Sequence, residues 1–198
     1  MMVIMQSKPT RKQVSHDRIV DVASRAIRRA GAHGVGVADI MKEAGLTHGG
    51  FYAHFESRNA LVSEAMRHAW QDTSQALTNA MARRVAAGES RFAALVNCYL
   101  HDSHLEKVEQ GCVIAALSSE MTRLDEAARG DAKRLVAQLI ELARSCLPPG
   151  CDPANGATVA STMTGALQLA RTLGGKQGRE LLALARKQLI NQFDPVLS

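Results

Sequence analysis

Apolar residues recur three and four positions apart along almost the entire chain, a spacing that places them on one face of an α-helix. In the segment 15–32 the apolar positions of this kind are Ile19, Val20, Ala23, Ala26, Ile27 and Ala30. The alternating β-branched runs that mark half-buried strands are absent. With 46% hydrophobic residues in 198, the chain can bury a substantial core. We therefore expect an all-α protein of about nine helices without a sheet.

Two short helical segments near the N-terminus are joined by a tight turn. We expect helices over 37–44 and 48–54, with Gly45 suited to a C-terminal cap and Thr47 to an N-cap. Two short helices around such a turn form a helix-turn-helix. Together with the helix over 15–32, they predict a three-helix head.

The aromatic residues of this head are predicted to be core. Phe51 and Phe55 lie four positions apart and therefore share one helix face. We expect both rings to pack against the first helix. The polar and glycine positions of the second short helix would then face outward.

The same pattern divides the chain into three regions. Residues 1–14 are expected to form a flexible basic arm, residues 15–60 the helix-turn-helix domain, and residues 61–198 a larger helical domain. A long helix that begins after Ser57 and continues through Met81 would link the head to the rest.

Positive charge concentrates at the N-terminal end. Residues 1–58 hold nine Lys or Arg against five Asp or Glu, whereas the remainder nearly balances at fifteen against fourteen. A local surplus of this kind attracts a polyanion such as DNA. Charge alone leaves a second interpretation open, an ordinary solvated surface.

The string GVADIMKEAGLTHGGFYAHFESRNAL over residues 36–61 closely resembles the DNA-binding signature of the TetR family of regulators, and the resemblance covers about residues 15–62. Its matching parts are Asp39-Ile40, Ala44-Gly45-Leu46-Thr47, Gly49, Tyr52, His54-Phe55 and Arg58. The chain departs at Gly36, where the family often has a Ser or Thr cap, and at Gly50, where a small hydroxyl residue or Ala is usual. The resemblance implies a homodimeric repressor that leaves a palindromic double-stranded DNA operator when a small-molecule inducer binds.

The resemblance also implies which residues contact DNA. The helix N-terminus at Thr47 suits a phosphate, and Arg11 and Lys12 are expected to reach an adjacent groove as part of the arm. The adjacent Gly49 and Gly50 permit close backbone approach, but each costs about 1 kcal/mol of helix stability, so a loosely wound helix is expected. The predicted DNA-binding residues are Arg11, Lys12, Thr47, His48, Gly49, Gly50, Tyr52, His54 and Arg58.

Beyond residue 62 the resemblance implies an architecture, in which middle helices surround a ligand cavity and the last two helices pair with a second subunit. Candidates for ligand contact are Trp70, Tyr99, His101, His104, Cys112, Leu117, Glu120 and Met163. Candidates for the dimer interface are Val159, Met163, Ala166, Leu167, Ala170, Leu182, Ala185, Leu189 and Phe193. Ligand binding would shift the helix after Ser57 and tilt the two heads away from successive major grooves, about 34–36 Å apart.

Two alternatives concern Cys112. Its place at a helix N-terminus is compatible with a thiol that senses electrophiles or oxidants, and equally with a small buried hydrophobe. A helical enzyme could use Cys112 as nucleophile with His101 or His104 as base. The sequence holds no glycine-rich phosphate loop and no nucleophile elbow, so we predict a regulator and not an enzyme, without catalytic residues or a cofactor. A protein-interaction bundle whose head no longer binds DNA is the third reading, and the retained Tyr52, His54 and Arg58 argue against it.

The four cysteines and the chain's start bear on location. Cys98, Cys112, Cys146 and Cys151 lack the paired spacing of zinc ligands, so no metal site is predicted. No run of eighteen apolar residues and no secretory signal is present. We expect a cytoplasmic protein with reduced thiols and no membrane partner.

Overall fold

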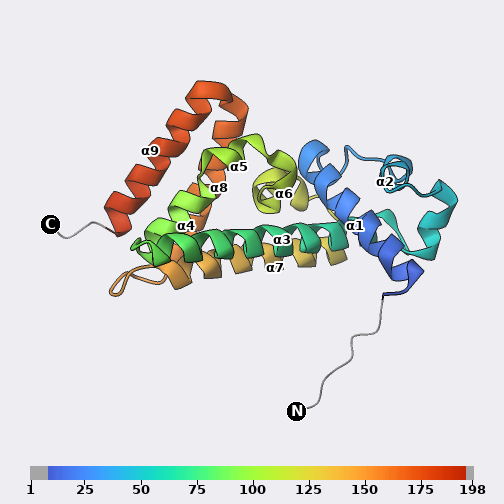
Figure 1. Ribbon diagram of the computed structural model, residues 1–198, viewed down its shortest axis with the longest axis horizontal. Coiled ribbons are helices and arrows are strands. Elements are labelled where there is room, and N and C mark those ends of the chain that lie inside the picture. Colours follow the sequence, from blue (N-terminus) through green and yellow to red (C-terminus); the bar gives the residue numbers. More distant parts are fainter. Residues whose placement is uncertain (1–8, 195–198) are drawn as a thin grey trace, which may run out of the picture.

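The computed structural model describes residues 9–194, which form nine α-helices and two short 3₁₀-helices without a strand. The α-helices are α1 (Arg11–Ala30), α2 (Val37–Glu43), α3 (Arg58–Ala86), α4 (Arg91–Tyr99), α5 (Asp102–Glu106), α6 (Val113–Met121), α7 (Glu126–Cys146), α8 (Asn155–Leu173) and α9 (Gly175–Phe193). The 3₁₀-helices are η1 (His48–Ala53) and η2 (Val108–Gln110). Figure 1 shows α1 and α2 at one end of the molecule, α3 along its length and α9 at the other end. The predicted all-α fold is confirmed.

The first helix begins earlier than predicted. The Thr10 side chain accepts a hydrogen bond from the Gln13 N–H at 3.2 Å, and the Gln13 side chain accepts one from the Thr10 N–H at 2.8 Å. This reciprocal capping box starts α1 at Arg11. The predicted arm over 1–14 is therefore wrong for its last residues, and its first eight lie outside the described residues. At the other end, α1 stops at Gly31, whose φ of +83° suits a residue without a Cβ.

Two further segments differ from prediction. The turn predicted as α-helix over 48–54 is the 3₁₀-helix η1, consistent with the low helix propensity of adjacent glycines at 49 and 50. The polar stretch over 101–111, for which no helix was predicted, contains α5 and η2. Short helices of this kind carry too few apolar positions to show a period.

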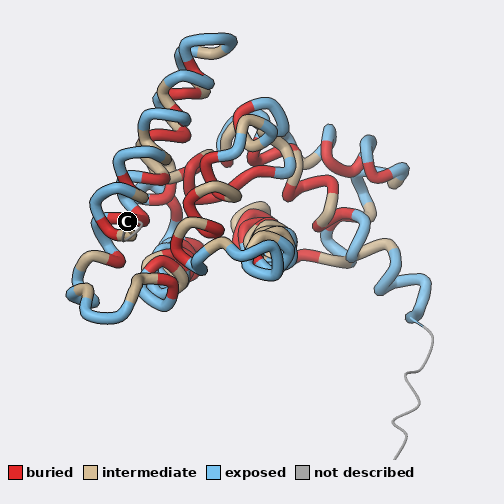
Figure 2. The backbone as a smooth tube through the Cα atoms, turned by 60° about the vertical axis from the view of Figure 1, so that its left-hand side comes forward, coloured by how far each residue is buried: buried red, intermediate tan, exposed pale blue. Residues whose placement is uncertain are grey.

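The long helix α3 organises the whole molecule. Its 29 residues span about 43 Å, and it packs against α1 near its start and against α4 and α7 further along. One continuous apolar core joins head and body, and Figure 2 shows the buried positions on the inward faces of the helices. Along α3, however, no residue between Ala69 and Met81 is fully buried. None of the described helices combines the length and apolarity needed to cross a bilayer.

Candidate DNA-binding surface and ligand cavity

The head is built on a small aromatic core. Phe51 is 2% exposed and Phe55 4% exposed, and their rings stack with centroids 5.6 Å apart. On the other side of Phe55, the ring of His16 from α1 stacks at 4.6 Å, and its Nε2 lies 2.7 Å from Oε1 of Glu64 in α3. The predicted core role of the two phenylalanines is confirmed. His16 could not be singled out from sequence, because a lone histidine on a helix carries no pattern.

The other side of η1 is open to solvent. Tyr52 is 75% exposed, the highest fraction among the large apolar side chains described. Thr47 and His48 are also exposed, and a Cβ added at Gly49 would meet no atom within 4 Å. A Cβ at Gly50 would lie 3.7 Å from Oγ1 of Thr47, an ordinary contact. The exposed side of η1 therefore presents backbone without a side chain at Gly49, next to the projecting ring of Tyr52.

His54 lies half-buried behind this surface. Its ring centroid is 6.0 Å from that of His16, and its Nδ1 is buried without a hydrogen-bond partner. Burial lowers the pKa of His54, and the nearby His16 and Lys12 lower that pKa further. His54 is therefore neutral at pH 7, and its ring can donate a single hydrogen bond.

The resemblance places Arg58 among the DNA-binding residues, but its guanidinium points into the head. Its Nη2 donates to the carbonyl oxygens of Ala32 and of Val35, the latter at 3.3 Å, in the turn between α1 and α2. Both contacts are partly buried. Arg58 therefore holds that turn against the start of α3, and its Nη2 is occupied within the chain.

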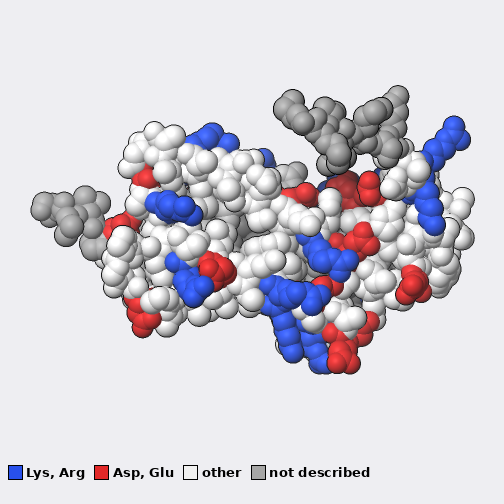
Figure 3. All heavy atoms as spheres, turned by 90° about the horizontal axis from the view of Figure 1, so that it is seen from below, with Lys and Arg blue, Asp and Glu red and all other residues white. Residues whose placement is uncertain are grey.

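Much of the head's positive charge is likewise used internally. Arg25 lies 2.8 Å from Asp21, and Arg29 lies 2.8 Å from Glu109 of η2. Within the described part of the head, the exposed cations outside any ion pair are Arg11, Lys12, Arg18 and Lys42. Arg11 and Lys12 are fixed in the first turn of α1 rather than carried on a loose arm. On the face seen in Figure 3, Lys and Arg project at the end that carries the head and are mixed with Asp and Glu along the body.

A cavity of about 230 Å³ lies beside the unburied stretch of α3. It is lined by Thr73, Ala76, Leu77, Ala80, Cys98, Tyr99, Ser103, His104, Lys107 and Gln110. These residues come from α3, α4 and the segment that contains α5 and η2. The lining is mostly apolar and includes no carboxylate, so its chemistry disfavours a cation.

His104 fixes the wall of this cavity. Its Nε2 accepts the Cys112 backbone N–H at 2.7 Å, so Nδ1 carries the proton and donates to the Tyr99 carbonyl oxygen, also at 2.7 Å. Burial lowers the pKa of His104 to about 4. A neutral histidine with both ring nitrogens occupied positions the wall and leaves no ring nitrogen for a ligand.

The predicted ligand-binding residues are dispersed. Tyr99 and His104 line the cavity, whereas His101 borders a neighbouring groove and Trp70 lies in a groove between α3 and α7. The carboxylate of Glu120 instead accepts the backbone N–H of His33 at 3.2 Å, in the head. A sequence period cannot distinguish these faces, because the direction of each helix is set by packing.

Three other predicted ligand contacts are core residues. Cys112 is 1% exposed, and Leu117 and Met163 are completely buried. None of them lines the cavity. The burial of Cys112 also leaves its thiol out of reach of an electrophile, so the sensor alternative is not supported.

The residues predicted for the dimer interface are mostly buried within one chain. Val159, Ala166, Leu167, Ala170, Leu182, Leu189 and Phe193, like Met163, are at most 9% exposed, and Ala185 is partly buried against the same core. The ring of Phe193, for example, lies 5.8 Å from that of Phe92 in α4. This correction has a simple cause: a helix that packs on both sides shows two apolar stripes, and the stronger one faces its own chain.

Residues 19–65, which hold the helix-turn-helix just described, match a family model described as bacterial regulatory proteins of the tetR family. The head of this chain is a DNA-binding domain of the TetR family. Members of this family are DNA-binding transcriptional regulators, and the matched residues include η1.

A curated relative matches the chain beyond the head. The HTH-type transcriptional repressor DhaR of Mycobacterium sp. (strain GP1) is 26% identical over 137 residues, which is 67% of this chain and 65% of DhaR. This chain therefore matches slightly less than two thirds of that repressor.

Solved structures share the fold. A TetR transcriptional regulator from Chloroflexus aurantiacus has 24% identity and a TM-score of 0.76, with 92% of this chain and 96% of that chain covered. AibR, solved with isovaleryl coenzyme A and operator DNA, has 15% identity and a TM-score of 0.62, with 91% and 98% covered.

Proposed function

We propose that this TetR-family protein is a repressor that binds operator DNA through the exposed side of η1 and leaves it when a small molecule enters the cavity. The observation that carries the DNA part is the 75% exposure of Tyr52 beside the open backbone at Gly49. Tyrosine is enriched at interfaces, because its ring is apolar and its hydroxyl can donate a hydrogen bond. DhaR, named as a repressor, supports the sign of regulation.

The DNA contacts proposed are those of the open surface. Tyr52, Thr47 and His48 would donate hydrogen bonds to phosphates, and Arg11 and Lys12 would contribute charge from the start of α1. The backbone at Gly49 would approach the DNA closely. Arg58 is not among these contacts, because its Nη2 donates to the turn between α1 and α2 and draws the guanidinium toward that turn.

We also propose a homodimer, formed by the outer faces of α8 and α9. Leu169 is 61% exposed, Leu173 52% and Leu184 54%, while the inner faces of the same helices are buried. Three exposed leucines on two adjacent helices favour a second copy of the chain as the partner. Two heads would then read the two halves of a palindromic site.

The ligand proposed for the cavity is a compact, mainly apolar molecule that is neutral or negatively charged. Ala76, Leu77 and Ala80 supply apolar wall, and Lys107 is the cation in the lining. With His104 neutral and no carboxylate in the wall, a positively charged ligand would lose its hydration without compensation. The structure of AibR with isovaleryl coenzyme A is an example of this fold with an organic molecule bound.

A fluorescence-anisotropy titration tests the DNA part directly. Full-length protein is titrated onto duplexes that tile the DNA upstream of its own gene, with a shuffled duplex as control, at several salt concentrations. Selective binding at two proteins per duplex is expected. Equal affinity for the shuffled duplex would contradict the proposal.

A further inference from the structure

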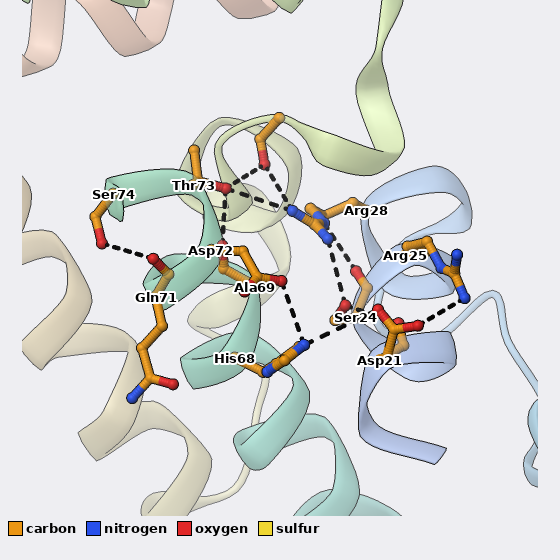
Figure 4. Close-up of polar contacts among 11 residues, drawn as sticks. Asp21, Ser24, Arg25, Arg28, His68, Ala69, Gln71, Asp72, Thr73 and Ser74 are labelled. Atoms are coloured by element: carbon orange, nitrogen blue, oxygen red, sulfur yellow. Dashed lines mark hydrogen bonds and ion pairs between the residues drawn. The ribbon is translucent and has the colours of Figure 1, made fainter. Parts of the chain in front are cut away.

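A buried arginine adds polar contacts to the apolar core that joins the head to the body. Arg28, near the end of α1, is only 5% exposed. Its Nη1 donates to the carbonyl oxygen of Gly111 at 3.3 Å and to Oγ1 of Thr73 at 3.4 Å. Its Nε and Nη2 donate to the backbone oxygen and the hydroxyl of Ser24, at 2.9 and 3.3 Å. Figure 4 shows Arg28 pointing from α1 toward Thr73 of α3.

Every oxygen that Arg28 contacts belongs to an uncharged group. In the described part of the chain, no carboxylate lies within ion-pair distance of it. The nearest acids are engaged elsewhere: Asp21 with Arg25 at 2.8 Å, and Asp72 with His68 at 3.2 Å. Burial lowers the pKa of Arg28 accordingly. A buried charge without an opposite charge is costly, so this junction depends on every one of its hydrogen bonds.

Of the two body residues that Arg28 contacts, one lines the cavity and the other is next in sequence to a lining residue. Thr73 lines the cavity itself, and Gly111 directly follows Gln110, which also lines it. A Cβ at Gly111 would collide with the side chains of Arg171 and His104, so the segment has no room on that side. A displacement of the cavity wall would therefore move the Gly111 carbonyl oxygen, because the segment has no space to shift on its other side.

One further contact ties the same region to α1, the 2.8 Å ion pair between Arg29 and Glu109 of η2. Close by, Glu120 of α6 accepts the N–H of His33, in the turn that follows α1. The segment 107–111 thus has the cavity on one side and the last turn of α1 on the other.

We propose that Arg28, Thr73 and Gly111 form the junction through which occupancy of the cavity reorients the head. The inference rests on the proposed ligand role of the cavity. A molecule that displaces Thr73 or the segment 107–111 moves two of the oxygens that Arg28 needs, and α1 moves with Arg28 because a buried guanidinium cannot stay unpaired. The DNA-bound and ligand-bound arrangements of α1 are thereby coupled.

A covalent probe can fill the cavity without knowledge of the natural ligand. Cys98 lines the cavity and is partly exposed, whereas Cys112 and Cys146 are buried. In a Cys151→Ser background, N-ethylmaleimide would alkylate Cys98, with completion followed by mass spectrometry. Burial raises the pKa of Cys98, so the reaction is expected to be slow. The added group would occupy much of the cavity.

The test compares the effect of alkylation on DNA affinity in three proteins. In the parent, alkylation should weaken binding to the selected duplex by about tenfold. In Thr73→Val, which keeps shape but removes the hydroxyl, the loss should shrink to about twofold or less. Ser74→Ala is the matched control, because the Ser74 hydroxyl donates to Gln71 within α3 and not to Arg28. This control should keep the tenfold loss.

Each outcome decides the question. An equal loss in the parent and in Thr73→Val would overturn the junction and leave the cavity's role intact. No loss in any protein would overturn both. Cys98→Ser, treated identically, must show no change. Amide hydrogen exchange supplies a second readout: alkylation should speed exchange in the last turn of α1 in the parent and not in Thr73→Val.

Discussion

The head and the body of this protein prepare their sites in opposite ways. In the head, buried rings such as Phe51 hold a thin scaffold, and the proposed contact is made by side chains that project from it, above all Tyr52. In the body, the core is extensive. The proposed site there is a cavity beside the part of α3 between Ala69 and Met81, in which no residue is fully buried. The proposed DNA-binding site consists of side chains that lie outside the packed core, and the proposed ligand site is a cavity between packed helices.

This difference determines which mutations harm which function. In the head, stability and binding reside in different residues of the same short helix. In the body, residues of the cavity wall also support the fold, as His104 does by joining Tyr99 to Cys112. Substitutions in the head should therefore separate stability from function, and those in the cavity wall should combine them.

The largest effect should come from Phe51→Ala. Removal of a fully buried ring costs about 3–5 kcal/mol, because a cavity replaces well-packed contacts. Tyr52→Ala, one residue along, should change the free energy of unfolding by no more than about 0.5 kcal/mol. Urea unfolding followed by circular dichroism measures both. Similar losses in the two variants would show that the head does not separate scaffold from surface.

Acid should weaken the body through His104. Because burial lowers its pKa from 6.5 to about 4, the unfolded chain binds a proton first as the pH falls. The stabilising contribution is complete above pH 6.5 and is lost between there and about pH 4. Between about pH 7 and about pH 4.5 it should amount to about 2–3 kcal/mol. The free energy of urea unfolding is measured against pH in wild type and in His104→Gln, and the difference between the two curves gives the contribution of His104. Parallel curves for the two proteins would contradict the assignment.

Sequence alone predicted the head well because its signals are local. The spacing of Phe51 and Phe55 and the Gly45 turn act within a few residues. Thr47 stands at the predicted N-cap position of η1, but its side chain makes no capping hydrogen bond. The prediction failed in the head where a contact joins residues that are far apart in the sequence. Nothing within a few residues of Arg58 indicates that its guanidinium reaches back 26 positions to Ala32.

The body was predictable as a set of helices and not as a site. Its periods place apolar residues inward, but whether a given residue fills the core, as Leu117 does, or lines the cavity, as Tyr99 does, depends on the packing of several helices. The junction at Arg28 joins positions 28, 73 and 111, and no local pattern links them. An arginine among the apolar positions of α1 was the one available hint.

A smaller effect distinguishes the two possible roles of Arg58. Arg58→Met leaves two backbone carbonyls without their donor and should cost about 1–3 kcal/mol of unfolding free energy. The salt dependence of DNA binding by Arg58→Met should equal that of wild type. Lys12→Gln is the matched charge change on the exposed start of α1, and should lower the slope of log K against log salt by about 0.9 with no loss of stability. The reverse pattern would return Arg58 to the DNA surface.

The smallest and most discriminating change is Tyr52→Phe. If the hydroxyl donates to a phosphate, its loss should weaken DNA binding by about 1–2 kcal/mol, roughly five- to thirtyfold. The salt slope should hold, because no cation is removed. If the ring face makes the contact instead, Tyr52→Phe should bind as wild type while Tyr52→Ala binds poorly. Either result keeps η1 at the DNA, but wild-type affinity in both variants would mean that the most exposed aromatic residue of the head serves another partner.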